Sequence, residues 1–182
     1  MNHVILFEHQ AVAAALDQMA KHISDRVINP EADQPEATEI CLVGIQRGGA
    51  KVADAIQQRL EQTGHSVCRG NLDISFYRDD LDTIGPNPEV RPSDLPFDVS
   101  GKHIWLVDDV LYTGRTIRAA MDVLFDYGRP NSIRLAVLLD RGGRQLPICA
   151  NNTGLLHAAP PDCTVDLITT SETWHIEQRQ VK

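Results

Sequence analysis

The sequence predicts an α/β protein with a mostly parallel central sheet flanked by helices. Two observations support this class. Short apolar runs alternate with segments whose apolar residues recur every three or four positions, and glycine-containing turns join a run to the periodic segment that follows it. Strand, glycine turn and helix form the unit from which parallel sheets are built. Because the chain has 182 residues, about the length of one domain, we expect residues 1–182 to fold as a single domain.

The predicted elements follow one another along the chain. A helix over residues 10–27 has Val12, Leu16 and Met19 on one apolar stripe, and it ends before Pro30. The remaining predictions, in order, are a strand over 40–45, a helix after Gly49, strands over 67–77 and 103–107, a helix opening at Gly114, strands over 133–139 and 165–169, and turns over 151–154 and 160–161.

The stretch between Arg78 and Asp98 has no apolar period. It contains six acids, two arginines and four of the ten prolines. An irregular stretch of this length in a compact domain is typically a functional lid or a flexible loop. A solvated surface excursion explains the composition equally well.

Charge and hydropathy exclude several classes of function. The formal net charge is −8, whereas general nucleic-acid binding needs a basic face. No apolar run approaches the roughly 18 residues that span a bilayer, and the N-terminus lacks the basic region of a signal peptide. We therefore expect a cytoplasmic protein without membrane association.

The four cysteines are Cys41, Cys68, Cys149 and Cys163. They lie far apart in the sequence, with no C-x-x-C pair and no histidine at zinc-finger spacing. We expect buried thiols, and neither a structural zinc site nor a disulfide framework.

The strongest chemical signal lies between residues 104 and 116. An apolar run delivers Asp108 and Asp109 to the end of a predicted strand, and a helix opens soon after at Thr113-Gly114-Arg115-Thr116. Ligands of open α/β sheets bind beyond the carboxyl ends of the strands, and the unpaired N–H groups of a helix N-terminus bind anions. Adjacent carboxylates suit vicinal hydroxyls or a water on Mg²⁺, so a ribose phosphate would satisfy both halves. Either half alone is equally typical of a solvated strand end or an ordinary helix start.

This stretch resembles the phosphoribosyl pyrophosphate (PRPP) signature of type I phosphoribosyltransferases. The shared pattern is an apolar run, two acids, two apolar residues, one variable position and Thr-Gly-x-Thr. The resemblance implies the type I phosphoribosyltransferase fold, with a flexible loop and a small hood. It also implies that Asp108 and Asp109 hold the ribose hydroxyls, with Mg²⁺ bound there through PRPP and water, and that residues 113–116 cradle the 5′-phosphate.

Two further blocks, residues 72–81 and 140–148, are similar to the PyrR proteins, pyrimidine-operon regulators that also act as uracil phosphoribosyltransferases. Residues 107–130 are similar to that family nearly throughout. They include Tyr112, where purine-salvage relatives commonly carry an acid. The resemblance covers about residues 10–150. It implies a homo-oligomeric enzyme, a dimer or larger, that converts uracil and PRPP into UMP and pyrophosphate.

The PyrR resemblance also implies a pyrophosphate site. Residues 43–49 look like the pyrophosphate loop of the fold, in which Arg47 and Gly48 would bind PRPP. Glycines after a strand expose backbone amides to an oxyanion, and an arginine adds a charge-assisted hydrogen bond. Arg78 is expected to act in catalysis by reaching the pyrophosphate when the following loop closes. A surface ion pair with Asp79 or Asp82 is the alternative.

The base is expected to lie against Leu139, Asp140 and Arg141, just beyond a predicted strand. Backbone groups and the Arg141 guanidinium would pair with the carbonyl edge of uracil. The alternative is a Gly-Gly turn with two solvated arginines.

Messenger RNA is the partner implied by the second activity of PyrR proteins. Members that bind RNA typically carry Thr-Arg and a histidine on the first helix, where this chain has Asp17, Gln18 and Lys21. An acid on that face repels phosphate, so the sequence favours the enzyme. A UMP-sensing RNA-binding regulator with little turnover, or a phosphoribosyltransferase for another nucleobase, stays the alternative. The basic residues that could still form a local patch are Arg129, Arg134, Arg141 and Arg144.

Overall fold

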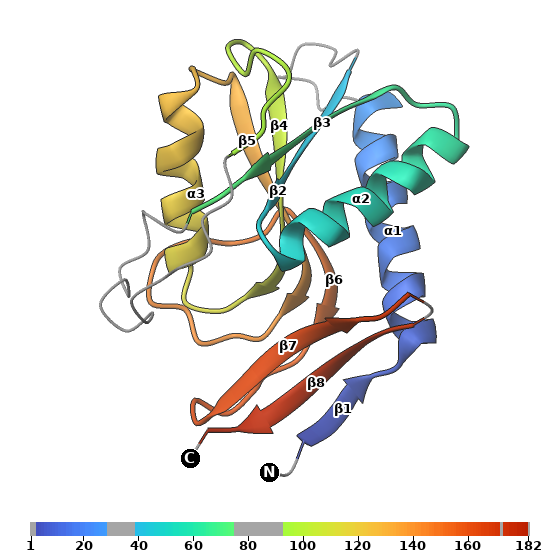
Figure 1. Cartoon of the computed structure of the whole chain (residues 1–182), viewed down its shortest axis with the longest axis vertical. Coiled ribbons are helices and arrows are strands. Elements are labelled where there is room, and N and C mark those ends of the chain that lie inside the picture. The colour runs from blue at the N-terminus through green and yellow to red at the C-terminus, as the bar shows by residue number, and fades with distance from the viewer. Residues whose placement is uncertain (1–2, 29–38, 75–92, 172, 182) are drawn as a thin grey trace.

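The computed structural model describes residues 3–28, 39–74, 93–171 and 173–181 (Figure 1). The central sheet has five parallel strands in the order β3-β2-β4-β5-β6. These strands are β2 (Ile40–Ile45), β3 (Val67–Leu72), β4 (His103–Leu111), β5 (Ser132–Asp140) and β6 (Asn152–Leu156). The helices are α1 (His9–Ile28), α2 (Gly48–Gln62) and α3 (Arg115–Asp126). The predicted α/β class with a mostly parallel sheet is therefore confirmed.

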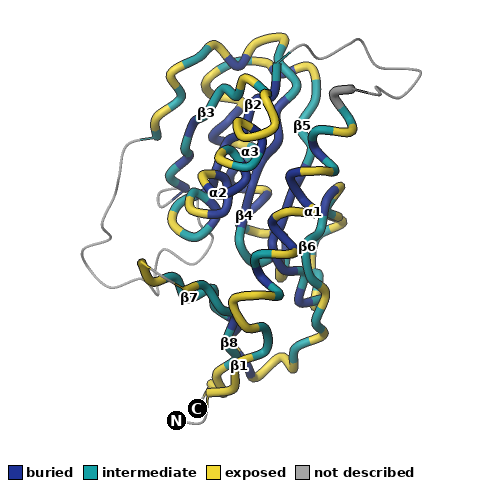
Figure 2. Tube along the Cα trace, turned by 90° about the vertical axis from the view of Figure 1, so that its right-hand side faces the viewer, coloured by how far each residue is buried: buried dark blue, intermediate teal, exposed yellow. Residues whose placement is uncertain are grey.

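Helices cover both faces of the central sheet, α1 and α2 on one face and α3 on the other (Figure 1). Alternate residues of each strand enter two separate apolar clusters: Leu42 and Trp105 face α1 and α2, whereas Val43 and Leu106 face α3. Buried residues follow the central strands and the inward sides of the helices (Figure 2). Burial on both faces explains why the strands are continuous apolar runs in the sequence.

A second sheet lies beyond the carboxyl ends of the central strands (Figure 1). It is antiparallel, with the order β1-β8-β7, and we call it the hood sheet; its strands are β1 (His3–Phe7), β7 (Cys163–Thr169) and β8 (Trp174–Gln180). Val165 and Ile176 are buried in the same cluster as α1 and α2, which packs the hood against the main core. The sequence analysis did not predict β1, because its pairing partner β8 lies at the other end of the chain.

One predicted strand is longer than expected, and one predicted turn is a strand. β4 does not end at residue 107 but continues to Leu111, because its pairing with β5 runs on to Leu111 opposite Asp140. Residues 152–154 are not a turn but the start of β6. Asn152 is buried there, and its side-chain amide donates to the Met19 carbonyl of α1 (3.0 Å). Asn152 therefore connects α1 to β6 and does not form a turn.

The predicted strand over 67–77 ends at Leu72 among the described residues. Most of the predicted loop after it, including Arg78, lies outside the described residues. The described flanks of this segment meet at Asn71 and Asp94, which exchange two backbone hydrogen bonds of 2.7 and 2.9 Å. The loop hypothesis for the segment between them stays a prediction.

The cysteines are free thiols, but the expectation that all four are buried was wrong. Cys41 and Cys163 are buried, Cys68 is half-buried and Cys149 is exposed. Within the described ranges, no helix is both long and apolar enough to cross a membrane.

The buried bond between β6 and α1 leads to a stability prediction. We expect Asn152→Ala to lower the free energy of unfolding by about 1–3 kcal/mol, because it removes the partner of a buried hydrogen bond. Asn131→Ala is the matched control: the Asn131 amide donates to the Gly101 carbonyl (2.7 Å) at the exposed surface. We expect this control to cost about 0.5 kcal/mol or less. Urea unfolding of both variants measures the difference, and equal losses would show that α1 and β6 do not depend on this bond.

Candidate active site

The two acids of the sequence motif lie inside β4, near its carboxyl end. Asp108 is buried, with 5% of its surface exposed, and Asp109 is half-buried. The Asp108 carboxylate accepts the Asp109 N–H (3.0 Å), and the Asp109 carboxylate accepts the Val110 N–H (3.0 Å). These bonds fix two adjacent carboxylates on the edge of the sheet that faces the hood.

The turn after β2 packs directly onto these carboxylates. A Cβ atom on Gly48 would lie 1.8 Å from Asp109 Oδ2, and one on Gly49 would lie 2.4 Å from the Val107 carbonyl oxygen. A side chain at Gly48 would have to displace the Asp109 carboxylate, and one at Gly49 would have to displace the backbone of β4. The structure therefore joins two motifs that lie about sixty residues apart in the sequence. Arg47 is exposed beside this contact, and the peptide bond between Gln46 and Arg47 is cis.

The expected phosphate cradle lies in the turn between β4 and α3. Gly114 precedes the helix in the left-handed conformation (φ +93°), which glycine adopts without strain. The Thr113 hydroxyl accepts the Arg115 N–H (3.3 Å). The first N–H groups of α3, including that of Thr116, have no carbonyl one turn earlier in the helix, and such groups bind anions. The turn therefore offers amides and hydroxyls next to the carboxylate pair.

Residues 140–148 hold this turn in place. The Thr113 carbonyl accepts the N–H groups of Gln145 (3.0 Å) and Leu146 (3.1 Å). The Arg115 guanidinium donates to the Gln145 side-chain oxygen (3.1 Å), which directs this arginine toward the segment beside it. Three of the sequence blocks thus meet at one edge of the sheet.

The residues expected to bind the base have side chains that are engaged within the protein. Leu139 is fully buried in the core, and Asp140 pairs with Arg144. Arg141 is 4% exposed, and its guanidinium donates to the carbonyls of Pro160 (2.9 Å) and Cys163 (2.8 Å). The expectation that this guanidinium pairs with uracil is therefore corrected, because both of its terminal nitrogens donate to backbone beside the hood.

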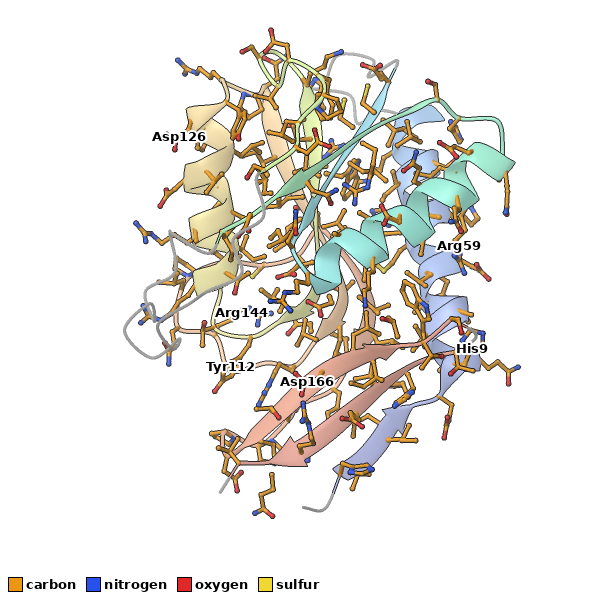
Figure 3. All side chains as sticks on the ribbon, viewed as in Figure 1. His9, Arg59, Tyr112, Asp126, Arg144 and Asp166 are labelled. Atoms are coloured by element: carbon orange, nitrogen blue, oxygen red, sulfur yellow. The ribbon has the colours of Figure 1, made fainter. Side chains whose placement is uncertain are left out.

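Tyr112 is a part of the site that the sequence analysis noted only for its position in the motif. Its ring lies under the Arg141 guanidinium, 4.1 Å from its centre, and is about one-third exposed. A Cβ on Gly143 would lie 2.4 Å from the same ring. The labelled Tyr112 and Arg144 side chains lie between the central sheet and the hood (Figure 3). The glycine at position 143 is the sequence signal that could have indicated this close contact. In the structure it adopts the left-handed conformation (φ +74°).

Two of the four arginines considered as a basic patch for RNA, Arg141 and Arg144, are engaged within the protein. Arg144 donates to the backbone carbonyls of Tyr112 (2.5 Å) and Ile148 (3.0 Å) and pairs with Asp140. Because Arg141 is buried as well, the alternative of two solvated arginines at this turn was wrong. Arg134 lies over the Trp105 ring, 5.6 Å from its centre.

Comparisons with known proteins identify the family of this chain. The family model described as "Phosphoribosyl transferase domain" matches residues 5–160. "Bifunctional protein PyrR" of Roseiflexus sp. (strain RS-1) is 49% identical over 144 residues, which cover 79% of this chain and 75% of the relative. The protein of the same name from Endomicrobium trichonymphae is 44% identical over 156 residues, covering 83% and 84% of the two chains.

Solved structures support the fold. The hypoxanthine phosphoribosyltransferase of Trypanosoma cruzi superposes with a TM-score of 0.68 at 20% identity, covering 98% of this chain and 97% of that one. A hypoxanthine-guanine phosphoribosyltransferase from Bacillus anthracis gives a TM-score of 0.62 at 19% identity, covering 87% and 82%. The site described above lies within the matched residues. The chain therefore belongs to the phosphoribosyl transferase domain family and, within it, to the PyrR proteins.

Proposed function

We propose that this protein transfers the phosphoribosyl group of PRPP to uracil, giving UMP and pyrophosphate. The observation that carries the proposal is the contact of the Gly48 turn with the carboxylate pair Asp108 and Asp109, beside the turn that opens α3. PRPP is a ribose with a phosphate at one end, a pyrophosphate at the other and vicinal hydroxyls between them. A protein that binds PRPP therefore needs these three features close together on one edge. We further propose that the enzyme acts in the cytoplasm as a homo-oligomer.

Each part of PRPP has a proposed partner. Asp108 and Asp109 accept hydrogen bonds from the ribose hydroxyls, and the residues from Thr113 to Thr116 bind the 5′-phosphate. Arg47 and the backbone of Gly48 bind the pyrophosphate, since arginine forms strong charge-assisted bonds with such oxyanions. Arg78, outside the described residues, is proposed as a second cation for the same group.

The carboxylate pair also fits a magnesium ion, because carboxylate oxygens and waters are the ligands that this ion prefers. Asp108 and Asp109 would hold Mg²⁺ through PRPP and water. When bound, the ion would neutralise part of the pyrophosphate charge.

The reaction breaks the bond between C1 of the ribose and pyrophosphate and forms a bond from C1 to N1 of uracil, which loses its proton. Positive charge builds up on the sugar on the way. The carboxylates of Asp108 and Asp109 stabilise this charge, and Arg47 stabilises the negative charge on the leaving group. The carboxylates are held by backbone N–H groups before the substrate arrives, so little reorganisation of these charges is needed during the reaction.

The pyrimidine preference is proposed from Tyr112. Its ring is held from one side by the Arg141 guanidinium and is in contact with Gly143. In this arrangement the neutral ring and the backbone after Leu139 line the base, while Arg141 acts as a positioning residue. No carboxylate occupies this position to contact a purine ring.

RNA binding as the main function has less support from the described surface of α1. Asp17 pairs with Arg59 of α2 (2.6 Å), and Lys21 pairs with Asp25 (2.6 Å). These ion pairs neutralise basic side chains that would otherwise attract phosphates. The word "Bifunctional" in the relatives' name keeps regulation of pyrimidine genes as a second activity to be tested.

The acceptor base is tested by measuring pyrophosphate release from PRPP and Mg²⁺ with uracil, hypoxanthine or guanine. We expect release with uracil and much slower release with the purines. A parallel titration with RNA at increasing salt tests the alternative. Pyrophosphate release with a purine but not with uracil would overturn the uracil assignment. Tight, salt-sensitive RNA binding without turnover would show that the protein is a regulator and not an enzyme.

The carboxylate pair predicts the effect of Asp109→Asn. We expect kcat to fall on the order of 100- to 1000-fold, because a preorganised charge at the sugar is lost, while thermal stability changes little. Asp122→Asn is the control, since Asp122 is an exposed acid on α3 paired with Arg118 (3.1 Å). Equal kcat in the two variants, or a collapse of the melting temperature in the first, would make Asp109 a structural residue.

The phosphate cradle predicts the effect of Thr113→Val. We expect UMP to bind about tenfold more weakly, since a hydrogen bond to a charged group contributes about 1.5–3 kcal/mol. Calorimetric titration measures the change. Thr63→Val is the matched control, because Thr63 follows the far end of α2, where its hydroxyl donates to the Leu60 carbonyl (2.8 Å). Unchanged affinity in the Thr113 variant would contradict the cradle.

A further inference from the structure

A cluster of three potential metal ligands lies at the end of the central sheet opposite the active site. Cys41 of β2 and Cys68 of β3 are directly opposite each other in the parallel register, so their side chains point to the same face. The Cys68 thiol donates to Glu39 Oε1 (2.8 Å), and the Cys41 sulfur lies 4.0 Å from Glu39 Oε2. The ligand atoms of all three residues lie within 4.8 Å of one another.

This cluster is separate from the proposed PRPP site. Cys41 is paired with Ile104 of β4, four residues before Asp108 along the strand. At about 3.3 Å per residue, that separation is about 13 Å. The cluster lies where β2 and β3 begin, at the upper end of the sheet in Figure 1, whereas the hood covers the other end.

We propose that Glu39, Cys41 and Cys68 bind a thiophilic divalent cation, of which Zn²⁺ is the type, with water as a fourth ligand. Two sulfur ligands and one carboxylate oxygen form a set typical of zinc, and they disfavour magnesium, which takes oxygen ligands. A tetrahedral ion with bonds of about 2.0–2.3 Å needs its ligand atoms about 3.3–3.8 Å apart. The three ligand atoms already lie within 4.8 Å of one another, so small side-chain movements would complete the set. Because Glu39 and Cys68 are only half-buried, the site is open to an entering ion.

Lys102 competes with the cation for Glu39. Its ammonium lies 2.5 Å from Glu39 Oε2, so a bound ion would have to share or displace this contact. Lys102 is well exposed and can swing away, since its side chain has 39% of its surface accessible. Because of this competition, removal of the positive side chain at Lys102, which lies outside the ligand set, should tighten cation binding.

Ionisation of the thiols sets the pH dependence of the site. Burial, and then the neighbouring Cys68 and Glu39, raise the pKa of Cys41 to about 12. Burial and the hydrogen bond to Glu39 raise the pKa of Cys68 as well, whereas the nearby Lys102 favours both thiolates. The thiols are therefore protonated at neutral pH without metal, and a cation must displace their protons. Binding should release protons and become tighter as the pH rises.

The experiment uses the full-length protein, reduced and freed of metal with a chelator. Cobalt(II) and then zinc(II) are the probes. We expect one cobalt ion per chain, with the strong near-ultraviolet absorption of thiolate-to-cobalt charge transfer, and displacement of that absorption by zinc. Cobalt at the oxygen ligands of Asp108 and Asp109 would not give this absorption, so the signal separates the two ends of the sheet.

Substitutions identify the ligands. We expect Cys68→Ser to weaken zinc binding by about tenfold or more, since loss of even an outer-shell partner of a metal site costs about 10- to 100-fold. Cys41→Ser is expected to do the same. Because Cys41 is buried, the circular dichroism spectrum of the Cys41→Ser variant is checked for loss of folding. The zinc affinity of the Cys68→Ser variant is the decisive measurement. Cys149→Ser and Cys163→Ser are the matched controls and should leave affinity unchanged, whereas Lys102→Met should increase it.

Three results would overturn the proposal. The first is cobalt binding without thiolate absorption, and the second is unchanged zinc affinity in Cys68→Ser. The third is thiol titration showing that Cys41 and Cys68 form a disulfide in the protein as isolated, because oxidised sulfurs would not ligate zinc in this way. Tighter binding in the Lys102 variant, together with loss in the cysteine variants, would support the proposal.

Discussion

The structure depends on the close approach of two backbone segments, the turn after β2 and the acidic end of β4. Gly48 and Gly49 lie so near Asp109 and Val107 that a methyl group would not fit at either position. This contact brings the glycine turn at the start of α2 next to two carboxylates held by neighbouring N–H groups. Two adjacent carboxylates and a glycine turn therefore share one edge of a rigid parallel sheet. In the proposed reaction, this arrangement supplies preorganised groups for the transfer of a charged sugar.

Side chains that the sequence suggested would be exposed connect the hood to this edge of the sheet. Arg141 donates to carbonyls of Pro160 and Cys163 while its guanidinium lies over the Tyr112 ring, so one buried cation links the hood to Tyr112. Lys51 of α2 donates to Thr169 of β7 (2.5 Å) and adds a second link. These contacts hold the hood in a fixed position relative to the central strands. They also explain why Arg141, which the sequence left as a candidate for RNA binding, is buried.

The two ends of the sheet offer different chemistry. At the carboxyl ends, adjacent aspartates provide the hard oxygen ligands suited to Mg²⁺. At the opposite end, the thiols of Cys41 and Cys68 and the Glu39 carboxylate provide a softer set. The same parallel register creates both: it places residues of neighbouring strands side by side whatever their separation in the sequence.

The sequence by itself determined the class of fold, the strand–turn–helix units and the acidic motif, because these depend on local periodicity and on residues that are neighbours in the chain. It also indicated the family, which the comparisons confirmed. Only the tertiary structure decided that β4 continues through Asp108 and Asp109, that residues 152–154 form a strand and that β1 pairs with β8. The same is true of the burial of Arg141 and the meeting of Cys41 with Cys68. In each case the deciding partner lies on another segment, and neither residue carries a local signal of a contact that exists only after the chain has folded.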